Sequence, residues 1–131
     1  MLQRIGALAA LAISIALAGC GDSQRNSLTD IGNSQRGKQL LDGYGCGACH
    51  VIPGIRTARG LVGPPLYFYA QRTMIAGQMP NTPPNLVRWI EHPESVDPKT
   101  AMPDLGVSQQ QASDMAAYLY TLRGHAHEES Q

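Results

Sequence analysis

The stretch YGCGACHVIPG, residues 44–54, holds the residues on which the interpretation of this chain depends. It places two cysteines three positions apart, Cys46 and Cys49, and a histidine, His50, directly after the second. On a helical turn, residues at i, i+3 and i+4 share one face, with neighbours about 5–6 Å apart. Three kinds of site use such a set: a redox dithiol, half of a zinc site, and an attachment point for haem.

The surroundings of these residues favour haem. A thioredoxin-like dithiol needs a strand–helix setting, whereas a loop rich in glycine and proline follows here, over residues 51–65. A structural zinc site needs four ligands, and the only further cysteine is Cys20. Cys-x-x-Cys-His is the attachment signal of c-type haem. The sequence therefore predicts one covalent haem c, bound through Cys46 and Cys49 with His50 on the iron; the dithiol and the zinc site stay as weaker alternatives.

The first twenty residues, MLQRIGALAALAISIALAGC, predict export. Arg4 precedes an uncharged apolar run, and small residues precede Cys20, as in a secretory signal. The run is shorter than the roughly 20 apolar residues of a spanning helix. LAGC also resembles the lipobox of bacterial lipoproteins, which implies a signal peptide over 1–19 and a lipidated Cys20 as the new N-terminus. The alternative is ordinary signal cleavage nearby with an incidental cysteine.

Composition bounds the rest of the chain. Residues 20–33 are polar and predict a flexible tether, residues 34–124 predict the folded domain, and residues 125–131 predict a disordered tail, with metal binding by its two histidines as the alternative. Ten basic residues balance ten acidic ones, so there is no basic footprint for nucleic acid. With one Trp and one Phe, the side chains alone would form a weak hydrophobic core in so small a domain. A large apolar cofactor at the centre would supply the missing apolar surface.

Helix signals dominate the domain and predict an all-α fold. The last helix is marked by Ser108 and Gln111 in capping-box spacing, followed by apolar residues at i, i+3, i+4 and i+7. Asn33 or Ser34 can cap the first helix, and Thr82 can cap a third that stops before a proline. Helices are predicted over residues 35–44, 66–77, 82–92 and 108–124, with a loop over 94–107.

In this order, the pieces RGKQLL, CGACH, GPPL, AMPDLG and ASDMAAYLYTLR resemble class I cytochromes c over residues 34–124. The segment from IAGQMPNTPPNLVRWI to YLYTL is particularly similar to the cytochrome c domains fused to subunit II of some haem–copper oxidases. The resemblance implies the class I fold, in which the N- and C-terminal helices pack across each other around one haem.

Two methionines, Met79 and Met102, are the candidates for the second axial ligand. Each precedes a proline, which stiffens its loop. The first helix leads into the haem-binding turn, so the loop that enters the last helix has to return over the opposite haem face. Met102 lies in that loop, and MPDLG matches the ligand loop of the family. Met102 is therefore predicted as the ligand, with Met79 as the alternative, while Met115 belongs to the packed stripe of the last helix.

The resemblance also implies contacts around these ligands. The carbonyl oxygen of Pro64 accepts a hydrogen bond from His50 Nδ1–H, which orients the ring and raises its basicity, and Leu66 packs on the porphyrin. Gly37 keeps the first helix small, so that Tyr118 on the last helix can approach it closely.

The middle of the chain offers two further candidates. Arg72 and Trp89 are the polar or amphipathic groups expected to bond the haem propionates. The alternative is a solvated guanidinium and an ordinary buried indole.

With both axial positions filled by protein, one-electron transfer is the expected chemistry and the protein is not expected to be an enzyme. A lipid-tethered carrier is predicted in a respiratory chain, with a quinol-oxidising complex or dehydrogenase as donor and a terminal oxidase as acceptor. It would be held at a bacterial membrane, in the periplasm or on the outer face of the cytoplasmic membrane. The alternatives are a fixed haem subunit of a larger oxidase or dehydrogenase complex and, more remotely, a peroxidase-type enzyme with an open sixth position.

Overall fold

A computed structural model describes residues 31–123. The predicted signal peptide, the predicted lipidation site Cys20 and the predicted tail over 125–131 lie outside the described residues. Within the described part, no helix is long and apolar enough to cross a membrane. The elements follow in the order α3 (Ser34–Gly43), η1 (Cys46–Ala48), η2 (Tyr69–Gln71), β1 (Met74–Ile75), β2 (Met79–Pro80), α4 (Pro83–Glu91), α5 (Pro93–Val96) and α6 (Gln109–Leu119), where η denotes a short 3₁₀ helix.

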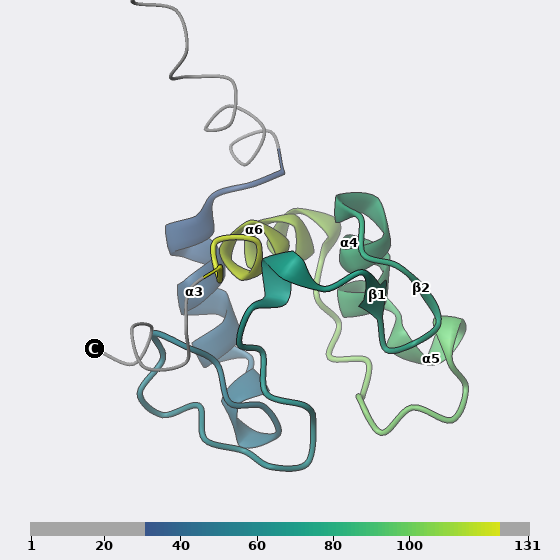
Figure 1. Cartoon of the computed structure of the whole chain (residues 1–131), viewed down its shortest axis with the longest axis horizontal. Coiled ribbons are helices and arrows are strands. Elements are labelled where there is room, and N and C mark those ends of the chain that lie inside the picture. Colours follow the sequence, from purple (N-terminus) through teal and green to yellow (C-terminus); the bar gives the residue numbers. More distant parts are fainter. Residues whose placement is uncertain (1–30, 124–131) are drawn as a thin grey trace, which may run out of the picture.

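Helices α3 and α6 pack across each other and make the most extensive contact between any two of the described elements (Figure 1). Gly37 lies at their contact: a Cβ atom there would be 1.8 Å from the carbonyl oxygen of Asp114, so only glycine lets the two backbones approach. The predicted close approach at Gly37 is present, and the atoms nearest to an added Cβ belong to the backbone of Asp114 and Met115. Tyr118 donates a hydrogen bond to the carbonyl oxygen of Pro53, at 2.7 Å, and its approach to Gly37 stays a prediction.

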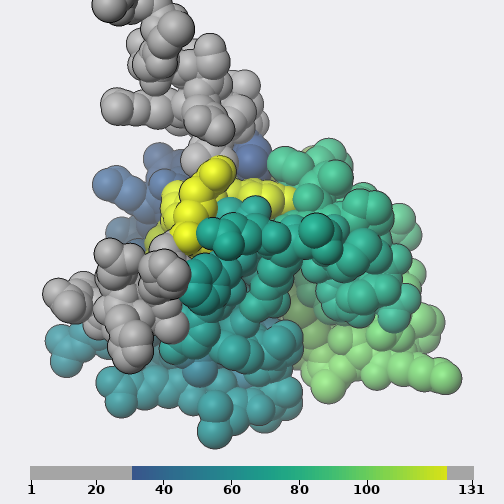
Figure 2. All heavy atoms as spheres, in the orientation of Figure 1, coloured from purple at the N-terminus to yellow at the C-terminus, as the bar shows by residue number. Residues whose placement is uncertain are grey.

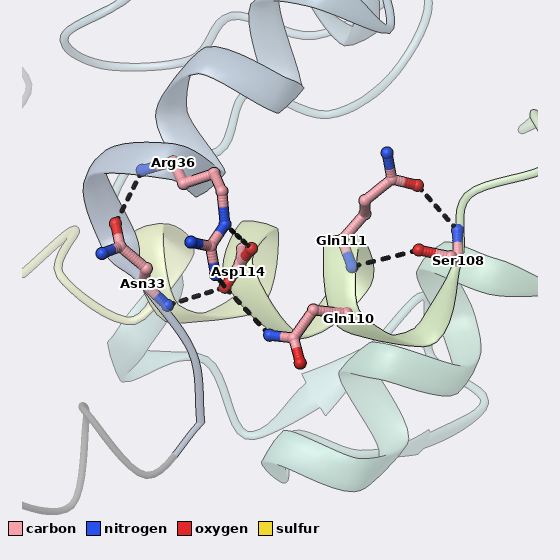
Figure 3. Close-up of polar contacts among 6 residues, drawn as sticks. All are labelled: Asn33, Arg36, Ser108, Gln110, Gln111 and Asp114. Atoms are coloured by element: carbon pink, nitrogen blue, oxygen red, sulfur yellow. Dashed lines mark hydrogen bonds and ion pairs between the residues drawn. The ribbon is translucent and has the colours of Figure 1, made fainter.

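A buried carboxylate, Asp114, ties the start of α3 to the middle of α6 (Figure 3). Its Oδ1 accepts from the main-chain N–H of Asn33 at 2.8 Å and from Arg36 Nη2 at 2.9 Å. Arg36 Nε donates to Oδ2, and Gln110 Nε2 donates to Oδ1 at 3.3 Å. The hydrogen bonds from Arg36 hold the pKa of Asp114 below its ordinary value, although burial opposes that shift. The sequence analysis did not identify this network.

Replacing Asp114 with asparagine is expected to lower the free energy of unfolding at pH 7 by about 2 kcal/mol, since hydrogen bonds to a charged group are lost. The carboxylate has a lower pKa in the folded than in the unfolded chain. Its contribution is therefore complete above the unfolded pKa of about 4 and disappears as the pH falls through the folded value. The free energy of unfolding, measured with urea, should fall more between pH 7 and pH 3 in the parent than in Asp114→Asn. An equal fall in the two proteins would contradict this assignment.

The apolar core lies between α3, α4, α6 and the segment that follows the attachment turn, which is the turn formed by η1 and residues 49–50. Helix α4 packs on α6, and its buried face carries Leu86 and Ile90. Met115 is fully buried, as predicted for a core residue. The other buried core members include Leu41, Ile52, Ile55, Leu66, Tyr69, Ile75, Val107, Ala112, Ala116, Leu119 and Tyr120.

The ends of the helices follow their capping residues. Both halves of the capping box that begins α6 are present, with the Ser108 N–H 3.0 Å from Gln111 Oε1 and the Gln111 N–H 3.4 Å from Ser108 Oγ (Figure 3). Helix α6 ends at Leu119, earlier than predicted. Helix α4 begins with Pro83, but Thr82 makes no side-chain capping bond. A short helix, α5, occupies the start of the predicted loop over 94–107.

The prediction of a helix over residues 66–77 is wrong. This segment contains η2 and β1, and β1 pairs antiparallel with β2, a ribbon that the sequence did not predict. The side-chain amide of Asn81 donates to the carbonyl oxygens of Tyr69 (3.2 Å) and Arg72 (2.9 Å), replacing bonds that a helix would have formed internally. Ala76 has φ 49° and the glycine after it φ 71°, as in the turns that favour hairpins.

Candidate haem-binding site

The three residues of the Cys-x-x-Cys-His motif lie on one tight turn after α3. The N–H groups of Cys49 and His50 donate to the carbonyl oxygen of Cys46, at 3.2 and 3.0 Å. Gly45, with φ 72°, lets the chain enter this turn directly from the helix. Both cysteines are half-buried and neither is in a disulfide bond, and burial raises the pKa of Cys46. The structure therefore presents two cysteine side chains and an imidazole from one turn.

The imidazole of His50 is held through one of its two nitrogens. Nδ1 lies 2.7 Å from the carbonyl oxygen of Pro64, the contact that the resemblance implied. A carbonyl oxygen only accepts, so Nδ1 carries the proton and donates it. In the neutral imidazole this arrangement leaves the lone pair on Nε2, and that tautomer is the form that binds a metal.

The segment 60–66 folds back onto the attachment turn. The N–H of Gly60 donates to the carbonyl oxygen of Gly47 at 2.9 Å, and the N–H of Gly63 donates to that of Cys49 at 2.8 Å. A Cβ atom at Gly63 would lie 2.3 Å from Cε1 of His50, so a glycine lets the backbone lie against the ring. Gly63 was not singled out from the sequence, although it opens the GPPL piece. Leu66 is buried, in the core cluster.

The candidate second ligand, Met102, lies in the loop between α5 and α6. Met102 is half-buried, and its N–H donates to Thr100 Oγ1 at 3.2 Å. This loop and the segment after the attachment turn lie at the same end of the molecule, below the crossing of α3 and α6 (Figure 1). Figure 2 shows them as two lobes, teal and green, with a recess between them. Met79, the alternative, is half-buried in β2 and packs against the core.

Arg72 and Trp89, the predicted propionate partners, differ in their surroundings. Arg72 Nη2 donates to the carbonyl oxygens of Pro65 and, at 3.4 Å, Tyr67, and its guanidinium lies 5.2 Å from the ring centroid of Tyr69. Arg72 is thus fixed next to the segment that contacts His50. Trp89 is half-buried on α4 and packs against the core. A propionate contact for either residue stays a prediction.

An exposed side-chain hydrogen bond joins the end of α4 to the Met102 loop. His92 Nδ1 lies 3.1 Å from Asp104 Oδ2, and Asp104 Oδ1 accepts from the N–H of Gly106 at 2.9 Å. The Gly106 N–H, followed by His92, holds the pKa of Asp104 below its ordinary value. His92 lies at the exposed end of a helix, as predicted; its pairing with Asp104 was not foreseen.

The sequence model of the cytochrome c family matches residues 34–123. The chain belongs to the cytochrome c family. It is similar to cytochrome c oxidase subunit 2 of Alkalihalophilus pseudofirmus, with 31% identity over 91 residues, which is 69% of this chain and 26% of that protein. The chain thus spans about a quarter of the length of that curated relative. No solved structure matches it.

The residues fit the covalently bound haem c of this family. Two cysteines on one turn, neither of them in a disulfide bond, match the two attachment points of the Cys-x-x-Cys-His motif. The imidazole beside them has Nε2 available for the iron, because the Pro64 carbonyl oxygen holds the opposite nitrogen. Membership of the cytochrome c family makes electron transfer the role of this domain.

Proposed function

We propose that this cytochrome c is a membrane-tethered one-electron carrier with a His/Met-ligated haem c, and that it passes electrons in a respiratory chain to a terminal oxidase. The observation that carries the proposal is the set of His50 contacts. The ring stands beside two free thiols with Nδ1 on the Pro64 carbonyl oxygen, which prepares it to bind iron through Nε2.

Each proposed ligand has a distinct role. Haem c, when bound, supplies a one-electron couple between ferric and ferrous iron. Cys46 and Cys49 would hold the cofactor covalently, and His50 would offer the iron a basic imidazole nitrogen. Met102 would offer a soft thioether sulfur, which favours the ferrous form and raises the reduction potential. With both side chains on the iron, small molecules would be kept from it.

Similarity to an oxidase subunit supports the choice of acceptor. The donor in this proposal is a quinol-oxidising complex or a dehydrogenase. The lipid on Cys20 would hold the domain at a bacterial membrane, in the periplasm or on the outer face of the cytoplasmic membrane. Mass spectrometry of the mature N-terminus tests the anchor, because an unmodified residue there would contradict it.

The same similarity favours a second candidate, a fixed haem subunit of a larger oxidase or dehydrogenase complex. Gentle detergent extraction separates the two. A carrier leaves the membrane without stoichiometric partners and is oxidised when added back to oxidase-containing membranes. A fixed subunit co-purifies with its complex at constant stoichiometry.

Replacing Met102 with alanine tests the second ligand. The variant is expected to lose the weak red sulfur-to-ferric absorption band. Its reduction potential is expected to fall by on the order of 100 mV or more, since axial ligands move haem potentials over a range of about 0.8 V. Absorption spectra and a potentiometric titration of the holoprotein measure both effects. Met79→Ala is the matched control: loss of the band there, with persistence in Met102→Ala, would assign the ligand to Met79.

A further inference from the structure

We infer that His92 is a positioning residue, and that its contact with Asp104 is a latch that fastens the Met102 loop to α4. The inference deepens the proposed function and rests on Met102 as an axial ligand. Its basis is the 3.1 Å contact between His92 Nδ1 and Asp104 Oδ2, which joins a helix end to the loop two residues beyond Met102.

The hydrogen bonds described within residues 98–106 are otherwise local. The N–H of Thr100 donates to the carbonyl oxygen of Asp97, and the N–H of Met102 donates to Thr100 Oγ1. The N–H of Gly106 donates to Asp104 Oδ1. These bonds shape the loop without attaching it to another element. Among the hydrogen bonds that residues 98–106 make, the one between Asp104 and His92 reaches the end of α4.

The helix side of the latch is firmly held. The N–H of His92 donates to the carbonyl oxygen of Arg88 at 2.9 Å, which closes the last turn of α4. The carbonyl oxygen of His92 accepts from the N–H and Oγ of Ser95, at 3.1 and 2.8 Å. Ile90 and Pro93 on either side are buried. The imidazole therefore extends from a fixed backbone, and the loop is the partner that gains order from the contact.

Proline transmits this order to Met102. Pro103 stands between Met102 and Asp104, its ring fixes φ near −65°, and it restricts the residue before it to extended conformations. Few backbone rotations then separate the latched carboxylate from the methionine. A loop fastened at Asp104 accordingly presents Met102 in a narrow range of orientations.

The latch contributes to local order rather than to global stability. The side chains of His92 and Asp104 are 61% and 44% exposed, and exposed ion pairs stabilise a fold only weakly. Loss of the contact should therefore change how often the loop opens and leave cooperative unfolding almost unchanged. This combination distinguishes a positioning role from a merely structural one.

The test compares His92→Ala with His92→Asn in the holoprotein at neutral pH. Asparagine keeps an N–H donor close to the place of Nδ1 and is expected to restore the contact. Thr57→Ala is the matched control, since it removes another exposed bond to a carboxylate, from Thr57 Oγ1 to Asp42 Oδ1 at 2.7 Å, far from the loop in sequence. Hydrogen exchange of the amides of Met102 and Gly106 reports loop opening, and the rate of cyanide binding to the ferric protein reports release of the axial sulfur.

In His92→Ala, both amides are expected to exchange roughly two- to fivefold faster, the range set by exposed ion pairs, and cyanide to bind faster by a similar factor. His92→Asn and Thr57→Ala should match the parent. Unchanged exchange in His92→Ala would overturn the latch, whichever residue binds the iron. A different outcome would be faster exchange in His92→Ala with unchanged cyanide binding, together with loss of the sulfur band in Met79→Ala. This outcome would show that the contact fastens the loop. It would overturn both the role of the contact at the iron and the proposed Met102 ligand.

Discussion

Replacing Cys46 and Cys49 together with serine is expected to abolish the covalent attachment of haem. A serine hydroxyl has nearly the shape of the thiol but lacks the nucleophilic sulfur that forms a thioether. Because both thiols lie on the turn that also carries His50, one pair of substitutions removes every covalent link to the cofactor. Intact-mass spectrometry of the exported protein should show only the polypeptide, and acid extraction should separate any pigment from it.

Two further variants make this result specific. Ala48→Ser places a hydroxyl between the cysteines, on an exposed position of the same turn, and should retain the full covalent mass. Cys46→Ser alone should keep pigment through Cys49 and lower its yield. A double variant that still carries pigment after denaturation would disprove thioether attachment at these residues.

Replacing Gly37 with alanine is expected to destabilise the domain by about 3 kcal/mol or more, at the upper end of what overpacking costs. The added Cβ would lie 1.8 Å from the carbonyl oxygen and 2.4 Å from the carbonyl carbon of Asp114. Both atoms belong to the backbone of α6, so neither can rotate away. Helices α3 and α6 would have to separate, exposing the core and straining the hydrogen bonds of Asp114. Thermal unfolding followed by circular dichroism should show a midpoint at least about 12 °C lower, at about 4–8 °C per kcal/mol.

Gly43→Ala is the matched control for this prediction. Gly43 is the last residue of the same helix, and a Cβ atom there would meet nothing within 4 Å. Alanine has the higher helix propensity, by up to about 1 kcal/mol, so this variant should unfold at the same temperature as the parent or slightly above it. If Gly43→Ala lost as much stability as Gly37→Ala, the loss at Gly37 could not be assigned to the contact between α3 and α6.

The features that could be predicted from the sequence depend on short stretches of chain. The spacing of Cys46, Cys49 and His50 predicted a shared turn, and the structure forms one. Ser108 and Gln111 predicted a capping box, and both of its bonds are present. In each case the interacting groups are at most four residues apart, so the spacing of the residues alone is enough to predict the contact.

The features that were missed depend on residues far apart in the chain. Arg36 and Asp114 are 78 positions apart, and nothing in their local sequence indicates a shared network. The wrong helix over 66–77 has a similar cause, since its backbone bonds are taken by the side chain of Asn81 and by the carbonyl oxygen of Leu122, which accepts from the N–H of Ala70. Local helix preference is weak enough for such tertiary bonds to override it.

Since the oxygen that holds Nδ1 of His50 belongs to the main chain of Pro64, no substitution at that residue can delete it. Substitutions at residue 64 are therefore expected to keep the hydrogen bond to Nδ1, and with it the basicity of the His50 imidazole. The proposed sulfur ligand has no such protection, because a single substitution at residue 102 removes the Met102 side chain. Descendants of this gene that adapt to new redox environments are expected to accumulate their tolerated changes in residues 97–107 and to leave the backbone path of residues 60–66 intact.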